Sequence, residues 1–311
     1  MRVTSNYFSN SLVNQLNLLT ARQYKLQNQA ATGQRIQSPE DDPAAMQRTM
    51  ELRAEASSLA QYTQNISVLQ EHANASYDAL TAVKKISDRA GEIATLADGT
   101  RSPEELKTYG AEVTQLIQQA VQSLNAKYGN QYLFSGTLSD QQPFTVTTDA
   151  NGLVTGVTYQ GNSTVADTQV ETGFTIAVDV PGENNSGSGA RGLIADSRFG
   201  ADFFNHLISL QNNLLAGDTN AIANTDRGNL QNDENNLLYH ISNNGAVQTR
   251  LDTAASLAGS RSLSVKKMVA NESSADLTDT IMQLNQTQTA YQAALQSSAN
   301  LFGMSLLNYL R

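Results

Sequence analysis

The chain has 311 residues, a formal net charge of −9 at pH 7, 40% hydrophobic residues and 6% aromatic residues. The acidic balance argues against nucleic-acid binding, because such proteins gather Lys and Arg to displace counterions from phosphates. The absence of Cys excludes disulfides, thiol catalysis and Cys-based zinc sites. The hydrophobic content is low for a globular domain and is typical of long helices with narrow apolar seams.

The amino-terminal segment predicts an amphipathic helix with a thin apolar seam. Its first ten residues, MRVTSNYFSN, lack the apolar stretch and cleavage site of a Sec signal peptide. No segment of the chain approaches the roughly 20 apolar residues needed to span a bilayer. We therefore expect a cytoplasmic protein or one exported by a non-Sec route. The seam residues are Leu12, Leu16, Leu19 and Leu26.

The stretch SPEDDPAA, residues 38–45, predicts the start of the next helix. Asp42 precedes Pro43, and Asp is a favoured N-cap while Pro suits the first helical position. Glu40 and Asp41 favour the positive end of the helix dipole. A calcium loop would instead need acids at alternate positions and a Gly turn. The turn from Ser38 to Pro43 is thus interpreted as a joint between helices, with a metal or hydrolytic site at Glu40, Asp41 and Asp42 as the distant alternative.

Two helices are expected after this joint. The first runs from Pro43 to about Leu96, and ten of its residues are spaced 3-4-3-4, which is a heptad seam. Ser102 and Pro103 then begin a second helix, which we expect to end near Tyr128-Gly129. The residues of the first seam are Leu59, Tyr62, Ile66, Leu69, Ala73, Ser76, Leu80, Val83, Ser87 and Ala90.

The middle of the chain has the features of β structure. The segments PFTVTT, LVTGVTY and FTIAVDV are rich in β-branched residues, and DANG at 149–152 predicts a turn. PGENNSGSGARG at 181–192 predicts a flexible surface loop or linker.

Helical patterns return after residue 200. Phe203, Leu207, Leu210 and Leu214 predict a short helix ending at Ala216-Gly217, and a long helix follows to about Val269. A terminal helix completes the pattern. Its seam, which with the amino-terminal leucines would form the assembly seam, comprises Leu277, Ile281, Leu284, Tyr291, Leu295, Phe302 and Leu306.

These elements predict a mainly α fold with a β insert. The order implies a long antiparallel, coiled-coil-like helical bundle built from both termini, with a small β-rich domain inserted in the middle. We divide it into terminal helices (1–42 plus 271–311), a helical bundle (43–136 plus 201–270) and a β-rich outer domain (137–200). Because a thin helical hairpin is marginal in water, the terminal helices are expected to be poorly ordered in the monomer and to order in an assembly.

No catalytic, cofactor or metal motif is recognised in the sequence. His72, His206 and His240 have no second His or Cys at ligand spacing, so we interpret them as surface or seam residues. No nucleophile elbow, Walker A or dinucleotide-binding motif occurs. We expect no catalytic, cofactor-binding or metal-binding residue, and therefore no cofactor and no enzyme.

Several segments resemble the bacterial flagellin superfamily. AATGQRIQSPEDDPAA (30–45) resembles its amino-terminal signature, and GAVQTRLD (245–252) resembles the carboxy-terminal partner of that signature. The final helix, from NESSADLT at 271 onwards, resembles the last helix of the same superfamily. NQYLFSGT (130–137), QPF (142–144) and YQGN (159–162) favour the hook–filament junction branch over filament flagellin.

The resemblance implies a structural subunit of the bacterial flagellum, exported through the flagellar type III channel and found outside the cell. Its expected partners are neighbouring copies in a ring, the hook-side junction protein, flagellin and a cytoplasmic export chaperone at the carboxy-terminal region. No nucleic acid and no membrane insertion are expected. The alternatives left open are filament flagellin and, more distantly, a surface hydrolase.

Overall fold

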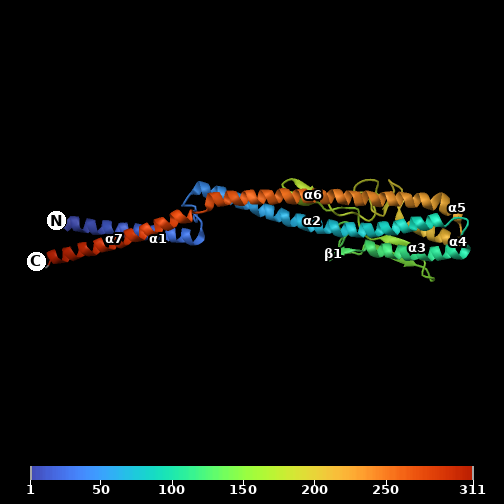
Figure 1. Cartoon of the computed structure of the whole chain (residues 1–311), viewed down its shortest axis with the longest axis horizontal. Helices are drawn as coiled ribbons and strands as arrows, with labels where there is room; N and C mark the ends of the chain where they lie inside the picture. Colours follow the sequence, from blue (N-terminus) through green and yellow to red (C-terminus); the bar gives the residue numbers. More distant parts are fainter. Residues whose placement is uncertain (1, 310–311) are drawn as a thin grey trace. The chain divides into compact units, whose positions relative to one another are not determined.

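In the computed structural model, the backbone is described for residues 2–309 and the side chains for residues 10–300. The chain divides into two compact units (Figure 1). Unit 1 comprises residues 1–58 and 261–311, and unit 2 comprises residues 59–260. The elements in chain order are α1 (Arg2–Thr32), α2 (Pro43–Leu96), α3 (Pro103–Leu124), β1 (Lys127–Tyr128), β2 (Gln131–Tyr132), β3 (Phe144–Thr148), β4 (Val154–Tyr159), β5 (Thr168–Glu171), β6 (Phe174–Ile176), β7 (Ala195–Asp196), β8 (Ala201–Asp202), α4 (Phe203–Ala216), α5 (Thr219–Ala221), the π-helical turn η1 (Ile222–Asp226), α6 (Arg227–Ser273) and α7 (Leu277–Tyr309).

Helix α2 forms as the sequence predicts, from Pro43 to Leu96. Nine of the ten residues of its heptad seam are buried, and Tyr62 is half-buried. The same agreement holds for α3, where Ser102 and Glu105 form a reciprocal capping box and Pro103 occupies the first turn. The predicted mainly α fold with a small β insert is confirmed.

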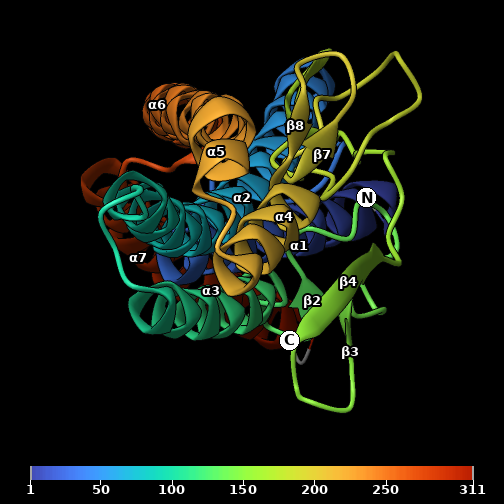
Figure 2. The same ribbon diagram turned by 90° about the vertical axis from the view of Figure 1, so that its right-hand side faces the viewer.

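Unit 2 is a helical bundle with β-hairpins packed on it. Figure 2 shows α2, α3, α4 and α6 side by side in this unit, with the β3–β4 hairpin beside α4. The main core contains fully buried large side chains, among them Phe134, Phe144 and Phe203. A second, smaller core packs Ile66 and Leu69 of α2 against Val170, Ile176 and Leu251.

The strands of the described residues pair as short antiparallel hairpins. In the β3–β4 hairpin, Phe144 lies opposite Tyr159, and Asp149 Oδ1 accepts the N–H of Asn151 and of Leu153 within the predicted turn. Gly152 takes a left-handed φ of 81° there, which favours glycine.

Two expected boundaries are wrong in this region. The helix expected to reach Tyr128 ends at Leu124, and residues 127–132 form the β1–β2 hairpin instead. The run FTIAVDV forms a strand only over Phe174–Ile176, which pairs with a strand at 168–171 that periodicity did not predict. Val178 nevertheless joins the smaller core, so its apolar character reflects burial and not strand pairing.

Unit 1 contains the antiparallel pair of α1 and α7, which lie side by side in Figure 1. The end of α1 lies next to the start of α7: Arg35 N–H donates to Ser273 O at 2.7 Å and Ala275 N–H to Gly33 O at 2.9 Å. Residues near the start of α2 and the end of α6 complete this unit. Within residues 2–309, no helix is long and apolar enough to cross a membrane.

Candidate assembly site

The contact between α1 and α7 uses small hydroxyl side chains where a stable helix pair would use large apolar ones. Thr280, Thr287 and Ser298 of α7 are buried, with 5–7% of their surface exposed. Each hydroxyl donates to the backbone carbonyl four residues earlier in the chain, at 2.6–2.7 Å. On α1, Leu26 is the buried leucine, with 6% exposure. The pair therefore has little apolar area to hold it together.

A strip of large apolar side chains on α7 is left open to solvent. Leu277, Ile281 and Leu295 are 48%, 50% and 44% exposed. At 100° per residue these three positions fall within about 40° of one another around the helix. We call them the apolar strip. Apolar side chains that line up on one exposed face mark a surface that another molecule covers.

The residues of the predicted assembly seam thus differ in their exposure to solvent. Leu12, Leu16 and Leu19 are half-buried on the same face of α1 as Leu26, and Leu284 and Tyr291 of α7 are half-buried as well. Leu277, Ile281 and Leu295 form the exposed apolar strip. The side chains of Phe302 and Leu306 lie outside the described residues.

The segment from Gly33 to Pro43 forms a polar joint with residues 272–276, all within unit 1. Asp41 Oδ2 accepts the backbone N–H groups of Gln37 and Ser38 at 3.0 and 3.1 Å. Lys25 Nζ lies 2.7 Å from Asp41 Oδ1. The Lys25 ammonium and the two N–H donors hold the pKa of Asp41 well below its usual range.

Asp42 caps α2, and Pro43 is its first residue. Asp42 Oδ1 accepts the N–H of Ala45 at 3.0 Å, and Arg35 Nη1 lies 3.4 Å from Asp42 Oδ2. The Ala45 N–H, ahead of Arg35, lowers the pKa of Asp42. Glu40 is exposed. The three acids therefore have separate surroundings and do not converge on one point.

An arginine–carboxylate pair connects α2 with the end of α6. Arg48 donates to both carboxylate oxygens of Glu272, at 3.1 and 3.0 Å. Arg48 lowers the pKa of Glu272. Arg35 adds a bond to the backbone carbonyl of Glu272 at 3.1 Å. Sequence reasoning missed Arg35 and Arg48, because Glu272, which both contact, is more than 200 residues away in the sequence.

The histidines, predicted to be surface or seam residues, each have a polar partner that spacing did not reveal. His240 is buried, and its Nε2 donates to Gly192 O at 3.1 Å; burial lowers the pKa of His240 to about 4. His206 Nδ1 lies 2.7 Å from the buried Asp233. Burial opposes the charged imidazolium of His206, but the bond and charge of Asp233 outweigh it and raise the pKa.

His72 is largely buried beside Asp179, with 3.4 Å between Nε2 and Oδ1. Burial lowers its pKa, and the charge of Asp179 opposes the change. Among the described residues, no group of three or more His, Cys, Asp or Glu side chains is arranged to hold a metal ion. The histidines thus have three different polar partners in three different places.

The motifs that suggested the junction branch meet around Tyr159 in unit 2. Its hydroxyl lies 3.0 Å from Phe134 O and 2.9 Å from Asn162 O, and accepts the N–H of Gly182 at 3.1 Å. Burial raises the pKa of Tyr159 to about 12. A Cβ at Gly182 would lie 2.5 Å from the Tyr159 ring, so this glycine is needed for close approach. The motifs therefore fix where the chain enters the β-hairpins.

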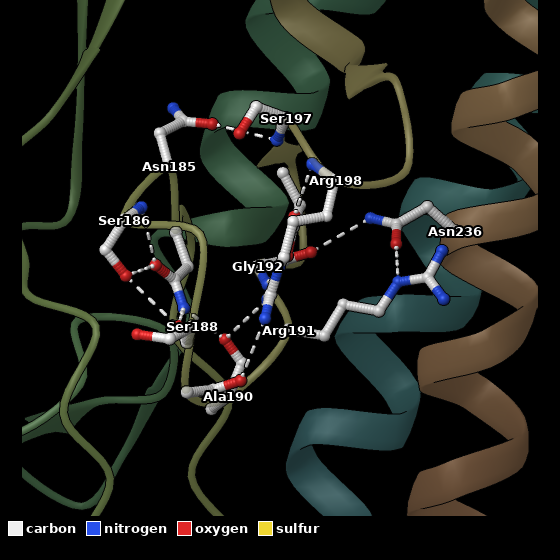
Figure 3. Close-up of polar contacts among 12 residues, drawn as sticks. Asn185, Ser186, Ser188, Ala190, Arg191, Gly192, Ser197, Arg198 and Asn236 are labelled. Carbon is white, nitrogen blue, oxygen red and sulfur yellow. Dashed lines mark hydrogen bonds and ion pairs between the residues drawn. The ribbon is translucent and has the colours of Figure 1, made fainter.

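The loop at 181–192, predicted to be a flexible surface loop or linker, is exposed at 185–189 and held by buried polar contacts on either side. Asn184 is buried, and its Nδ2 donates to Ser188 O and Ala190 O. Asn236 of α6 donates to Gly192 O at 3.0 Å and accepts from Arg191 Nε at 2.5 Å (Figure 3). The Gly, Ser and Asn residues here make tight turns around buried amides, a role that composition alone does not distinguish from flexibility.

The chain is similar in sequence to known flagellar proteins. Residues 3–139 match the model of the bacterial flagellin N-terminal helical region. The chain is 23% identical over 327 aligned positions to flagellar hook-associated protein 3 of Salmonella typhimurium, covering 100% of both chains. It is 24% identical to the protein of the same name from Escherichia coli, covering 91% of each.

Solved structures share the fold. A putative flagellar hook-associated protein from Vibrio parahaemolyticus has a TM-score of 0.61 at 20% identity, covering 75% of this chain and 100% of that one. Bacillus cereus FlgL has a TM-score of 0.55 at 16% identity, covering 71% and 99%.

The amino-terminal helical region thus matches that of bacterial flagellins over residues 3–139, and the fold is shared with a solved flagellar hook-associated protein. The two relatives that match along most or all of their length are both named flagellar hook-associated protein 3.

Proposed function

We propose that this chain is the structural subunit that forms the junction between hook and filament, and that its apolar strip is covered by neighbouring subunits. The observation that carries the proposal is the orientation of α7. Its small Thr and Ser side chains face α1, whereas Leu277, Ile281 and Leu295 stay 44–50% exposed. A monomeric protein gains nothing from this arrangement, but a packed assembly buries the strip.

The three parts expected from the sequence have different proposed positions in the assembly. Residues 1–42 and 271–311 form the inner layer of the tube, residues 43–136 and 201–270 the surrounding helical bundle, and residues 137–200 the outer β-rich domain. Terminal helices that are thin in the monomer become ordered when copies stack, because most helical stability comes from tertiary packing.

The proposed partners are copies of the chain in a ring, the hook-side junction protein on one side and flagellin on the other. Contacts that join different faces of identical subunits do not close in a dimer and so propagate around a ring or tube. A cytoplasmic export chaperone would hold the carboxy-terminal region before type III export. The apolar strip supports this, because a strip that is exposed before assembly needs cover in the cytoplasm.

Substituting the apolar strip tests the proposal. We expect the double variant Leu277→Ser and Ile281→Ser to be secreted but to attach filaments poorly, so that motility falls and flagellin monomer accumulates in the medium. Met282→Ser removes a comparably exposed apolar side chain (53%) from another face of the same helix and is the matched control. Normal motility and filament attachment in the double variant would contradict the proposal.

Filament flagellin remains the second candidate, since the matched family model is that of the flagellin amino-terminal region. The two functions differ in self-assembly. A junction subunit needs different neighbours on its two faces, whereas flagellin polymerises alone. Electron microscopy of the purified chain separates them, and long filaments from this chain alone would favour flagellin.

We propose no catalytic role for Glu40, Asp41 or Asp42. Asp41 and Asp42 are occupied by backbone N–H groups and by cationic side chains at the joint. Asp41→Ala should therefore weaken assembly or stability. A hydrolytic activity that disappears in this variant while assembly stays intact would support the hydrolase alternative.

A further inference from the structure

The turn between β3 and β4 contains an Asn–Gly step that the assembly function does not use. Asn151 and Gly152 are exposed at the tip of this hairpin, and Figure 2 shows the turn projecting away from the helices of unit 2. The Asn151 side chain makes one hydrogen bond among the described residues, a long contact of 3.4 Å from Nδ2 to Asp149 Oδ2. Its side-chain amide is therefore exposed to water and only weakly held.

Asparagine followed by glycine is the pair in which the side-chain amide is lost most readily, because glycine has no Cβ to hinder attack by its backbone nitrogen. That nitrogen forms a bond to the Asn Cγ and gives up its proton, and the side-chain nitrogen leaves with that proton as ammonia. The product is a cyclic succinimide. Water opens the ring at either carbonyl and yields aspartate or isoaspartate, so the reaction consumes water alone and involves no oxidation or reduction.

The chain has a second Asn–Gly step, Asn244–Gly245, which lies inside α6 and serves as an internal comparison. Asn244 is 5% exposed. Its Nδ2 donates to Ala73 O at 3.1 Å, and its Oδ1 accepts from Gln248 Nε2 at 2.8 Å. The backbone nitrogen of Gly245 belongs to the helical ladder, in which each N–H bonds to the carbonyl four residues earlier. Both reacting groups are thus held, and the helix must open before they can meet.

Bonds at the tip of the hairpin hold the reacting groups less firmly. The Gly152 N–H donates to Asp149 O at 3.1 Å, and this bond must open before the nitrogen can react. A bond in an exposed two-stranded hairpin opens far more often than one inside a long packed helix. Asn185, which precedes a serine, is also exposed, but serine carries a Cβ and Asn185 Oδ1 accepts the Ser197 N–H at 3.0 Å. Exposure, sequence and weak hydrogen bonding therefore coincide at Asn151.

We propose that Asn151 is a site of spontaneous deamidation and that its conversion loosens the β3–β4 hairpin as the protein ages. Asp149 Oδ1 accepts the N–H groups of Asn151 and Leu153, both at 2.9 Å, so one carboxylate already organises the turn. A second carboxylate at position 151 would lie beside it and repel it. Isoaspartate adds a further carbon to the main chain, which shifts the register of the buried Val154 against Thr148. Neither step depends on the proposed assembly function.

Incubation of the purified chain in mildly alkaline buffer tests the site, because base promotes attack by the backbone nitrogen. Samples taken over time are digested at acidic pH, and mass spectrometry measures the deamidated fraction of each peptide. We expect the Asn151 peptide to convert many-fold faster than the Asn244 peptide, into two products of equal mass, of which the isoaspartyl form is the substrate of an isoaspartyl methyltransferase. Incubation in guanidinium chloride is the matched control, since both steps should then react at similar rates.

Two outcomes would overturn the assignment of Asn151. If the Asn151 peptide stays intact in the folded chain but converts in guanidinium chloride, the turn protects this step as fully as α6 protects Asn244. If Asn151 and Asn244 convert at similar rates in the folded chain, burial and hydrogen bonding do not decide the site of reaction.

Hydrogen exchange measures the effect of the modification on the hairpin. Amides of β3 and β4 should exchange several-fold faster in aged wild-type protein than in fresh protein. Asn151→Gln, whose longer side chain cyclises far more slowly, should show no such change on ageing. Asn151→Asp introduces the charge without the added main-chain carbon and should give an intermediate acceleration. If deamidated wild-type protein and aged Asn151→Gln exchange alike, the hairpin tolerates the modification and the proposed loosening is wrong.

Discussion

Units 1 and 2 are both mainly helical and both bury aliphatic side chains, but among the described residues fully buried aromatic rings occur only in unit 2. Unit 2 encloses Phe134, Phe144, Phe203 and many aliphatic side chains with less than 2% exposure. In unit 1, the described α7 side chains that are buried are Thr280, Thr287 and Ser298. The hydrophobic contribution of a buried aromatic ring is several times that of a Thr methyl group. Helical periodicity alone therefore does not reveal which unit is stable by itself.

The largest loss of stability is expected from a substitution in the core of unit 2. Phe144→Ala removes a fully buried ring that lies 5.6 Å from the Phe204 ring and 5.2 Å from the Tyr159 ring. The loss of transfer energy together with the cavity should lower the free energy of unfolding by about 3–5 kcal/mol. Urea denaturation followed by circular dichroism measures it. Phe174→Ala, at a 41% exposed site, is the control and should cost far less.

A smaller loss of stability, confined to unit 1, is expected from a substitution in the seam of α1. Leu26→Ala removes the buried leucine of the α1 seam, and we expect a local cost of about 2 kcal/mol because the seam is thin. Hydrogen exchange should speed up in α1 and α7 while the amides of unit 2 keep their protection. Leu18→Ala, at a 70% exposed position of α1, is the control. Faster exchange throughout unit 2 would break the comparison, because it would show that the units unfold together.

A pH-dependent effect is expected in unit 2 alone. The folded pKa of His240 is lowered to about 4 from 6.5, so the unfolded state binds the proton more readily. The contribution of neutral His240 is therefore complete above pH 6.5 and is lost as the pH falls towards 4, by at most about 1.4 kcal/mol per pH unit.

His240→Gln removes this titration while leaving an amide that can donate to Gly192 O. The stability advantage of the wild-type chain over the variant should shrink between pH 6.5 and 4. Urea denaturation at several pH values measures it, and subtracting the variant removes the opposite contribution of His206, whose pKa is raised. A constant difference across this range would contradict the prediction.

The smallest effect is expected at the joint. Asp42→Ala removes the cap of α2, so the amides of its first turn should exchange about three- to tenfold faster. Asp42→Asn keeps a capping oxygen and should restore most of the protection while losing the contact with the Arg35 charge. If both variants exchange alike, the ionic contact and not the cap stabilises the turn.

The helices were predictable because their signals are local. The 3-4-3-4 seam from Leu59 and the pair Ser102-Pro103 each depend on residues within a few turns, and the structure agrees with both. The β insert was predicted only in outline. The strand at 168–171 and the anchored loop around Asn184 are stabilised by partners distant in sequence, such as Asn236 with Gly192, which no local pattern encodes.

The candidate site was predictable in part for the same reason. Spacing identified the apolar positions of α7, but it could not show that Leu284 and Tyr291 are half-buried while Leu277, Ile281 and Leu295 are exposed. The acids at 40–42 were recognised as a helix start. Their partners Lys25 and Arg35, and the Arg48–Glu272 pair, required tertiary contacts.

The self-satisfied hydroxyls of α7 have a mechanical consequence. Thr280, Thr287 and Ser298 each bond to their own helix, as Thr20 does on α1. These four hydroxyls therefore form no hydrogen bond between α1 and α7. A small sliding or tilting movement of one helix against the other would leave none of them without its acceptor. Such back-bonding also bends helices slightly. An interface built from these hydroxyls is therefore held by packing alone at these positions, so it resists sliding or tilting of the helices less than one with hydrogen bonds across it.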